Sequence, residues 1–201
     1  MTRRYLKFIV IIAALGGAGI AVFSDWHALG AESVHTPPDP AKARAAFTEA
    51  SKVFFSARCM NCHPSGDTPL QGDSNSVHAN DIVRGPKGRG SEELQCNICH
   101  QETNTEGEGM PPGVPDWHMP GPDMKMSFQG LTASQLCLQL KDPLRNGGRK
   151  LPKEAVQHIS TDPKVLWAWE PGNNRTKPPL SKADFLKKMD EWLANGADCP
   201  K

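Results

Sequence analysis

Hydrophobic and polar residues alternate with the period of an α-helix in a stretch that begins near residue 39. Asp39-Pro40 is typical of a helix N-terminus, because Asp caps the first turn and Pro fits the first helical position. Apolar residues then recur on one side of the predicted helix, which leads into Cys59. They are Ala43, Ala46, Phe47, Ala50 and Phe54.

The helical period returns from residue 130 onward in several shorter stretches. Thr132 and Gln135 form a capping-box pair at the start of one helix. Pro152 opens a second helix, and residues 161–163 (Thr-Asp-Pro) start a third. Ser181 caps a last amphipathic helix. The pattern therefore predicts a mainly α fold with much irregular loop and few or no strands.

The middle of the chain lacks any regular period. Glycine and proline are dense in residues 64–95 and again in residues 107–121, which predicts loops. Residues 91–94 (Ser-Glu-Glu-Leu) can start a short helix between them. Loops this long are unusual in a compact domain unless they wrap around something. We therefore expect a bound group in this region.

The N-terminus predicts export. A basic start precedes an apolar run over residues 8–23, which is short for a membrane span and is interrupted by glycines. Residues 1–30 are interpreted as a signal peptide cleaved after Gly30 or, if uncleaved, as an N-terminal membrane anchor. Residues 31–201 then form a single domain.

Composition and charge narrow the function classes. The 201 residues include 18 Gly and 18 Pro, and only 38% are hydrophobic, which limits the apolar core. The net charge is +1, and loss of residues 1–30, with three basic and one acidic side chain, leaves −1. The chain has no basic footprint of the kind that binds nucleic acid.

The sequence Cys-x-x-Cys-His occurs twice, at residues 59–63 and 96–100. Two cysteines at this spacing add to the two vinyl groups of a haem, and the histidine that follows is placed to bind the iron. The motifs therefore predict two covalent c-type haems. The predicted attachment residues are Cys59, Cys62, Cys96 and Cys99, and the predicted proximal ligands are His63 and His100.

Cys-x-x-Cys pairs have two other common uses, in zinc sites and in redox-active thiol pairs. Four cysteines in two Cys-x-x-Cys pairs can hold a zinc ion, but a zinc site does not require a histidine after each pair. A redox-active pair of the thioredoxin kind is expected in a βαβ setting, which the pattern does not predict.

The sixth iron ligand decides whether such a protein moves electrons or binds substrate. His78 follows His63 by fifteen residues and His118 follows His100 by eighteen, so each motif has one further loop histidine. They are the first candidates, followed by His158 and by Met110. The sequence does not determine which ligand serves which iron. Candidates for pairing with haem propionates are Arg84, Lys87 and Arg89.

Cys137 and Cys199 remain once the motifs are assigned. In an exported protein they are expected to form a disulfide, with two buried free thiols as the alternative. The closed loop of about 60 residues would stabilise the fold by roughly 4 kcal/mol.

The chain resembles a group of small exported dihaem c-type cytochromes, often labelled as a subunit of isoquinoline 1-oxidoreductase. The resemblance covers most of residues 31–201 and implies a cytochrome partner of molybdenum-containing hydroxylases. Besides the two Cys-x-x-Cys-His motifs it is carried by Gly66-Asp67, Gln71-Gly72-Asp73, Arg84-Gly85, Met110-Pro111-Pro112-Gly113, Trp117-His118, Asn146-Gly147-Gly148 and Trp167-Ala168-Trp169-Glu170-Pro171-Gly172.

The expected function is periplasmic electron transfer between a dehydrogenase and a downstream cytochrome or oxidase, with two haem c groups and no catalytic residue. One rival is a dihaem enzyme, of the peroxidase or thiosulfate-oxidising type, in which one iron is open. The other is an obligate cytochrome subunit of a molybdenum hydroxylase complex.

Overall fold

The computed structural model describes residues 37–201, which lie within one compact unit. Its helices are α1 (Pro40–Phe54), α2 (Ala57–Met60), α3 (Ala133–Lys141), α4 (Pro152–Thr161), α5 (Pro163–Trp167) and α6 (Lys182–Ala194). Short 3-10 helices are η1 (Pro86–Gly88), η2 (Cys96–Ile98) and η3 (Pro122–Met124), and the strands are β1 (Leu70–Gln71) and β2 (Ser76–Val77). The prediction of a mainly helical fold with few strands is confirmed.

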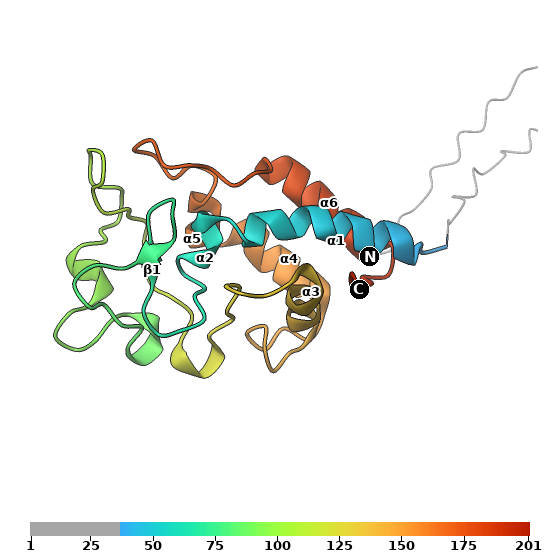
Figure 1. Cartoon of the computed structure of the whole chain (residues 1–201), viewed down its shortest axis with the longest axis horizontal. Coiled ribbons are helices and arrows are strands. Elements are labelled where there is room, and N and C mark those ends of the chain that lie inside the picture. Colours follow the sequence, from blue (N-terminus) through green and yellow to red (C-terminus); the bar gives the residue numbers. More distant parts are fainter. Residues whose placement is uncertain (1–36) are drawn as a thin grey trace, which may run out of the picture. The chain divides into compact units, whose positions relative to one another are not determined.

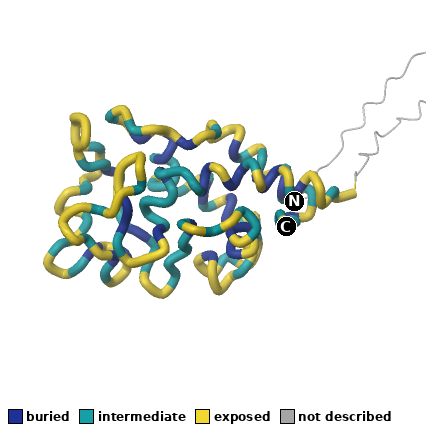
Figure 2. Tube along the Cα trace, viewed as in Figure 1, coloured by how far each residue is buried: buried dark blue, intermediate teal, exposed yellow. Residues whose placement is uncertain are grey.

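Helix α1 begins as its sequence predicts. The Asp39 carboxylate accepts a hydrogen bond from the Ala41 amide at 2.9 Å, and Pro40 occupies the first turn. One face of α1 is buried, so buried residues recur along it in Figure 2. Because three of these residues are alanine, α6 approaches α1 closely, and the two helices lie side by side (Figure 1).

The apolar core is built mainly from aromatic side chains between α1 and α6. Phe47 packs on Trp192 with ring centres 5.0 Å apart, and Phe54 packs edge-on against Phe185 at 5.5 Å. Trp192 is fully buried, and its indole N–H donates to the Asp198 carbonyl. Truncating a buried aromatic residue of this kind to Ala costs about 3–5 kcal/mol. The helices therefore form a core of their own.

Helix α3 joins this core through its cap and through a disulfide. The predicted capping box is present, with Thr132 and Gln135 each bonding the other's backbone amide. Cys137 on α3 is bonded to Cys199, which follows α6, with Cα atoms 5.6 Å apart. The predicted disulfide is confirmed and ties the C-terminal end to α3.

Two details of the predicted elements are wrong. The helix that leads toward Cys59 is not continuous: α1 ends at Phe54, and Cys59 lies on the separate one-turn helix α2. Residues 91–94 are not helical, because Gly90 and Gln95 pair across them and close a tight loop. The short hairpin β1–β2 was not predicted, since strands of two residues leave no readable alternation.

The long loops between α2 and α3, mainly green and yellow in Figure 1, are held together by a buried arginine. Arg84 is 1% exposed, and its guanidinium donates to the carbonyls of Gly66 at 3.0 Å and Pro120 at 2.6 Å. It also pairs with Asp67. Arg84 therefore fastens the loop after the first motif to the loop after the second.

The predicted signal peptide or membrane anchor, residues 1–30, lies outside the described residues. Within residues 37–201, no helix combines the length and the hydrophobicity that a membrane span needs.

Candidate haem-binding sites

Both Cys-x-x-Cys-His motifs adopt the same local conformation. In the first, the His63 amide donates to the Cys59 carbonyl at 3.1 Å, and in the second the His100 amide donates to the Cys96 carbonyl at 2.9 Å. These are single helical turns. Residues three and four positions apart lie on one face of such a turn, so each motif presents two sulfurs and one imidazole on one side.

Each motif lines a cavity. The larger cavity, of about 780 Å³, is lined by Cys96, Cys99 and His100, and the smaller, of about 360 Å³, by Cys59 and His63. Both volumes lie in the range of roughly 300–1,000 Å³ that is typical of cofactor pockets. Two residues, Arg58 and Cys62, line both cavities, so the cavities adjoin.

His63 is held on two sides by the segment that precedes α3. Its Nδ1 lies 2.7 Å from the Met126 carbonyl, and its ring stacks on Phe128 with centres 4.1 Å apart. A carbonyl only accepts, so Nδ1 carries the proton and Nε2 keeps its lone pair. Burial lowers the pKa of His63 to about 4, so the imidazole is neutral at pH 7.

His100 is held in the same way by a different segment. Its Nδ1 donates to the Pro112 carbonyl at 2.7 Å, and its ring stacks on Trp117 at 4.5 Å with the two planes 2° apart. Burial lowers the pKa of His100 below its usual value. Each predicted proximal histidine thus offers a neutral Nε2 on a ring fixed by one hydrogen bond and one aromatic contact.

His78 lies opposite His100 in the larger cavity, with the two ring centres 6.1 Å apart. Metal–imidazole bonds are about 2 Å long and each ring centre lies roughly 1.2 Å behind its nitrogen, so two imidazoles on one metal ion have centres roughly 6 Å apart. The Nδ1 of His78 donates to the Ala79 carbonyl at 2.8 Å, which leaves Nε2 free. Met110 lines the same cavity but is 45% exposed.

The smaller cavity contains two further histidines, His118 and His158. The Nδ1 of His118 donates to the Asp116 carbonyl at 2.7 Å, as in the three histidines above. His158 lies on α4, and its Nδ1 is 3.6 Å from the Asp162 carboxylate, beyond hydrogen-bond distance. His118 therefore makes the same Nδ1–carbonyl hydrogen bond as the other three histidines, and His158 does not.

The cysteines of the first motif are unlike reactive thiols. Burial raises the pKa of Cys59 to about 12 and that of Cys62 to about 11, with the nearby Cys96 adding to the effect at Cys62. Redox-active cysteines have lowered pKa values. This environment does not favour a reactive thiol pair at the first motif.

Comparison with protein-family models, with curated proteins and with solved structures gave no match to the chain. The resemblance to dihaem cytochromes therefore rests on the sequence motifs quoted above, and the site is interpreted from its own geometry.

The donor set fits haem. Among residues 37–201, no three or more His, Cys, Asp or Glu side chains gather in a group that could hold a bare metal ion. Haem iron needs only two protein ligands, because the porphyrin supplies the other four. The larger cavity contains two histidines, His78 and His100, at a spacing that suits one iron between them, and the smaller contains His63 with two further histidines.

The predicted propionate partners are not at the cavities, and other residues are. Arg84 is occupied by the loop contacts described above, Arg89 pairs with Asp116, and neither they nor Lys87 lines either cavity. The larger cavity is instead lined by Arg58 and Arg175. No local pattern marked these two, because they lie far apart in the sequence and meet only in the folded chain.

Proposed function

We propose that the chain is a periplasmic electron-transfer protein that carries two covalently attached c-type haems, each with two histidine ligands. Cys59 and Cys62 attach one haem, and Cys96 and Cys99 attach the other. The protein passes single electrons from a dehydrogenase to a downstream cytochrome or oxidase. When bound, the haem irons supply the reversible one-electron change.

The observation that carries the proposal is the pair His78 and His100. Two imidazoles face each other across a cavity lined by a Cys-x-x-Cys pair, at the spacing that a shared iron requires. Backbone carbonyls fix both rings with Nε2 free. An iron with two such ligands has no open position for substrate, which favours electron transfer over catalysis.

At the first motif we assign His118 as the partner of His63, because it lines the same cavity and its Nδ1 donates to a backbone carbonyl. The distal ligands are then exchanged: the loop after the first motif supplies His78 to the second haem, and the loop after the second motif supplies His118 to the first. Arg84, which joins these two loops, keeps the exchanged ligands in place.

The shared wall between the cavities supports direct transfer between the two haems. Arg58 and Cys62 line both cavities, so only one layer of side chains separates them. The protein's part in transfer is to hold both irons rigidly and to exclude water from them. Fixed ligands on both sides of each iron keep the reorganisation energy of electron transfer small.

Haem content and carbon monoxide binding test the proposal together. We expect two haems per chain and no shift of the Soret band when carbon monoxide is added to the reduced protein, because both irons are six-coordinate. His78→Ala is the positive control. It opens the sixth position of one of the two irons, so carbon monoxide should shift about half of the total Soret absorbance. A clear shift in the unaltered protein would contradict the carrier function and favour a dihaem enzyme.

A further inference from the structure

Two arginines from distant parts of the chain meet at the larger cavity. Arg58 comes from α2 and Arg175 from the loop between α5 and α6, and both line this cavity. Each guanidinium carbon lies 5.9 Å from the centre of the Trp167 ring, which also lines it. Cation–π contact with one indole therefore places both cations at the same part of the cavity.

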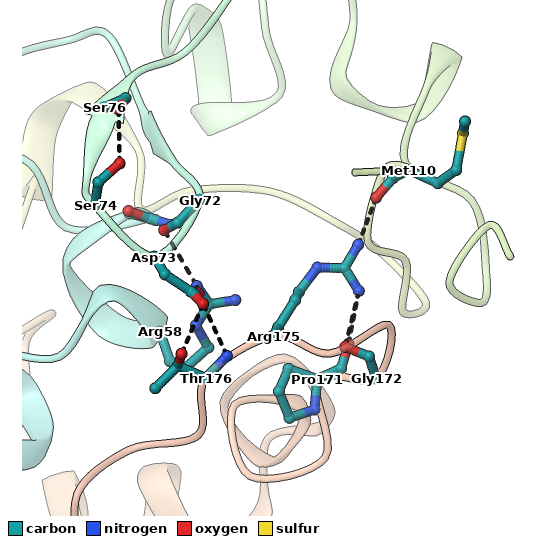
Figure 3. Close-up of polar contacts among 11 residues, drawn as sticks. Arg58, Gly72, Asp73, Ser74, Ser76, Met110, Pro171, Gly172, Arg175 and Thr176 are labelled. Atoms are coloured by element: carbon teal, nitrogen blue, oxygen red, sulfur yellow. Dashed lines mark hydrogen bonds and ion pairs between the residues drawn. The ribbon is translucent and has the colours of Figure 1, made fainter. Parts of the chain in front are cut away.

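The positive charge of Arg58 and Arg175 is only partly balanced by acidic side chains. The Asp73 carboxylate pairs with Arg58 and also accepts hydrogen bonds from the amide and hydroxyl of Thr176 (Figure 3). Arg175 donates to backbone carbonyls alone, those of Met110, Pro171 and Gly172. In the described part of the chain, Asp73 is the one acidic side chain paired with either arginine, and the exposed Glu108 on the cavity rim pairs with neither.

Arg58 also has an unused donor. Its side chain is 3% exposed, and the buried Nε–H has no hydrogen-bond partner among the described residues. Burying an N–H without an acceptor is destabilising, and such groups in native proteins are normally satisfied. Arg58 therefore lines the cavity with a guanidinium group whose hydrogen-bonding capacity the described residues do not fully use.

We propose that Arg58 and Arg175 bind the propionates of the haem attached to Cys96 and Cys99. The inference rests on the proposed function, since it needs haem in the larger cavity. The ligand class is a carboxylate, which pairs strongly with guanidinium groups. Two cations at the propionates stabilise the reduced iron, because they attract the added electron, and so raise the reduction potential of this haem above the value it would otherwise have.

The test is a redox titration of the full-length holoprotein, followed by optical and EPR spectra. Arg175→Gln is expected to lower the reduction potential of the haem at His100 and to leave the potential of the haem at His63 nearly unchanged. Arg175→Lys keeps the charge and should restore most of the shift. Arg44→Gln, on a surface ion pair with Asp198 outside both cavities, is the matched control and should change neither potential.

Arg58→Gln provides a second, independent variant, and the EPR signal that His78→Ala removes identifies the haem at His100. Unchanged potentials in both Arg175→Gln and Arg58→Gln, with two haems attached, would overturn the propionate site, as would a shift confined to the haem at His63. A wild-type chain without covalent haem would instead overturn the proposed function.

Discussion

Four histidines share a hydrogen bond that their positions in the sequence do not predict: each donates its Nδ1 proton to a backbone carbonyl. The bonds are 2.7 to 2.8 Å long and involve His63, His78, His100 and His118. This contact fixes the tautomer and leaves Nε2 with its lone pair, which is the usual arrangement of a histidine that binds a metal. His158 lacks it.

Single substitutions test the ligands one by one. His78→Ala and His118→Ala are each expected to remove one of two low-spin EPR signals and to make one haem reactive toward carbon monoxide, because each opens one iron. His158→Ala is the matched control, from the same cavity as His118, and should leave both signals in place.

The exchanged pairing has its own test. In a chain whose second motif is removed by Cys96→Ala, Cys99→Ala and His100→Ala, the remaining haem should respond to His118→Ala and not to His78→Ala. The opposite response would mean that each loop histidine serves the motif it follows.

At the residue scale the sequence predicted the attachment and proximal residues, because five adjacent residues define them through covalent chemistry. It also identified His78 and His118 as candidates. It did not predict the cavities around them. Loops of about thirty residues can adopt many conformations, and tertiary contacts such as the hydrogen bond from Arg84 to the Pro120 carbonyl select one of them. Arg58 and Arg175 were missed because their shared position depends on the ring of Trp167.

At the element scale the helices were predictable from their caps. Asp39, Thr132, Asp162 and Ser181 each cap the helix that their sequence context indicates. The break between α1 and α2 was not predicted, and it depends on one residue, Ser56, whose backbone is extended between the two helices. The break gives Cys59 a helical turn separate from the core helix.

The disulfide is the strongest single constraint on these elements. Replacing both cysteines, Cys137→Ser with Cys199→Ser, is expected to lower the free energy of unfolding by about 4 kcal/mol, because the unfolded chain gains the freedom of a long loop. Urea unfolding followed by circular dichroism measures the change. The haem spectrum at low urea is the control and should not differ, since neither residue lines a cavity. An unaltered unfolding midpoint would contradict this role.

At the scale of the whole molecule, the two cavities are built differently: the larger lies mainly among the loops between α2 and α3, and the smaller is lined by residues of the apolar core such as Phe54, Trp169 and Phe185. The core contains α1, α3 and α6, with aromatic residues such as Phe47 and Trp192. The loops between α2 and α3 contribute few buried apolar residues and instead line most of the larger cavity. The low hydrophobic content and these loops predicted a bound group in this region, and that group stays a prediction.

Export is also a property of the whole molecule. The predicted signal or anchor in residues 1–30 stays a prediction, and it agrees with the disulfide, which persists in oxidising compartments. In the proposal, the electron donor is a dehydrogenase and the electron acceptor is a cytochrome or oxidase.

Low-temperature EPR of the oxidised full-length protein tests the central claim most directly. Two haem irons, each with two histidine ligands, should give two low-spin signals of equal spin concentration and no high-spin signal. A high-spin signal from the native protein would show an open iron and contradict the assignment of His78 or His118. The absence of any haem signal would contradict the proposed function as a whole.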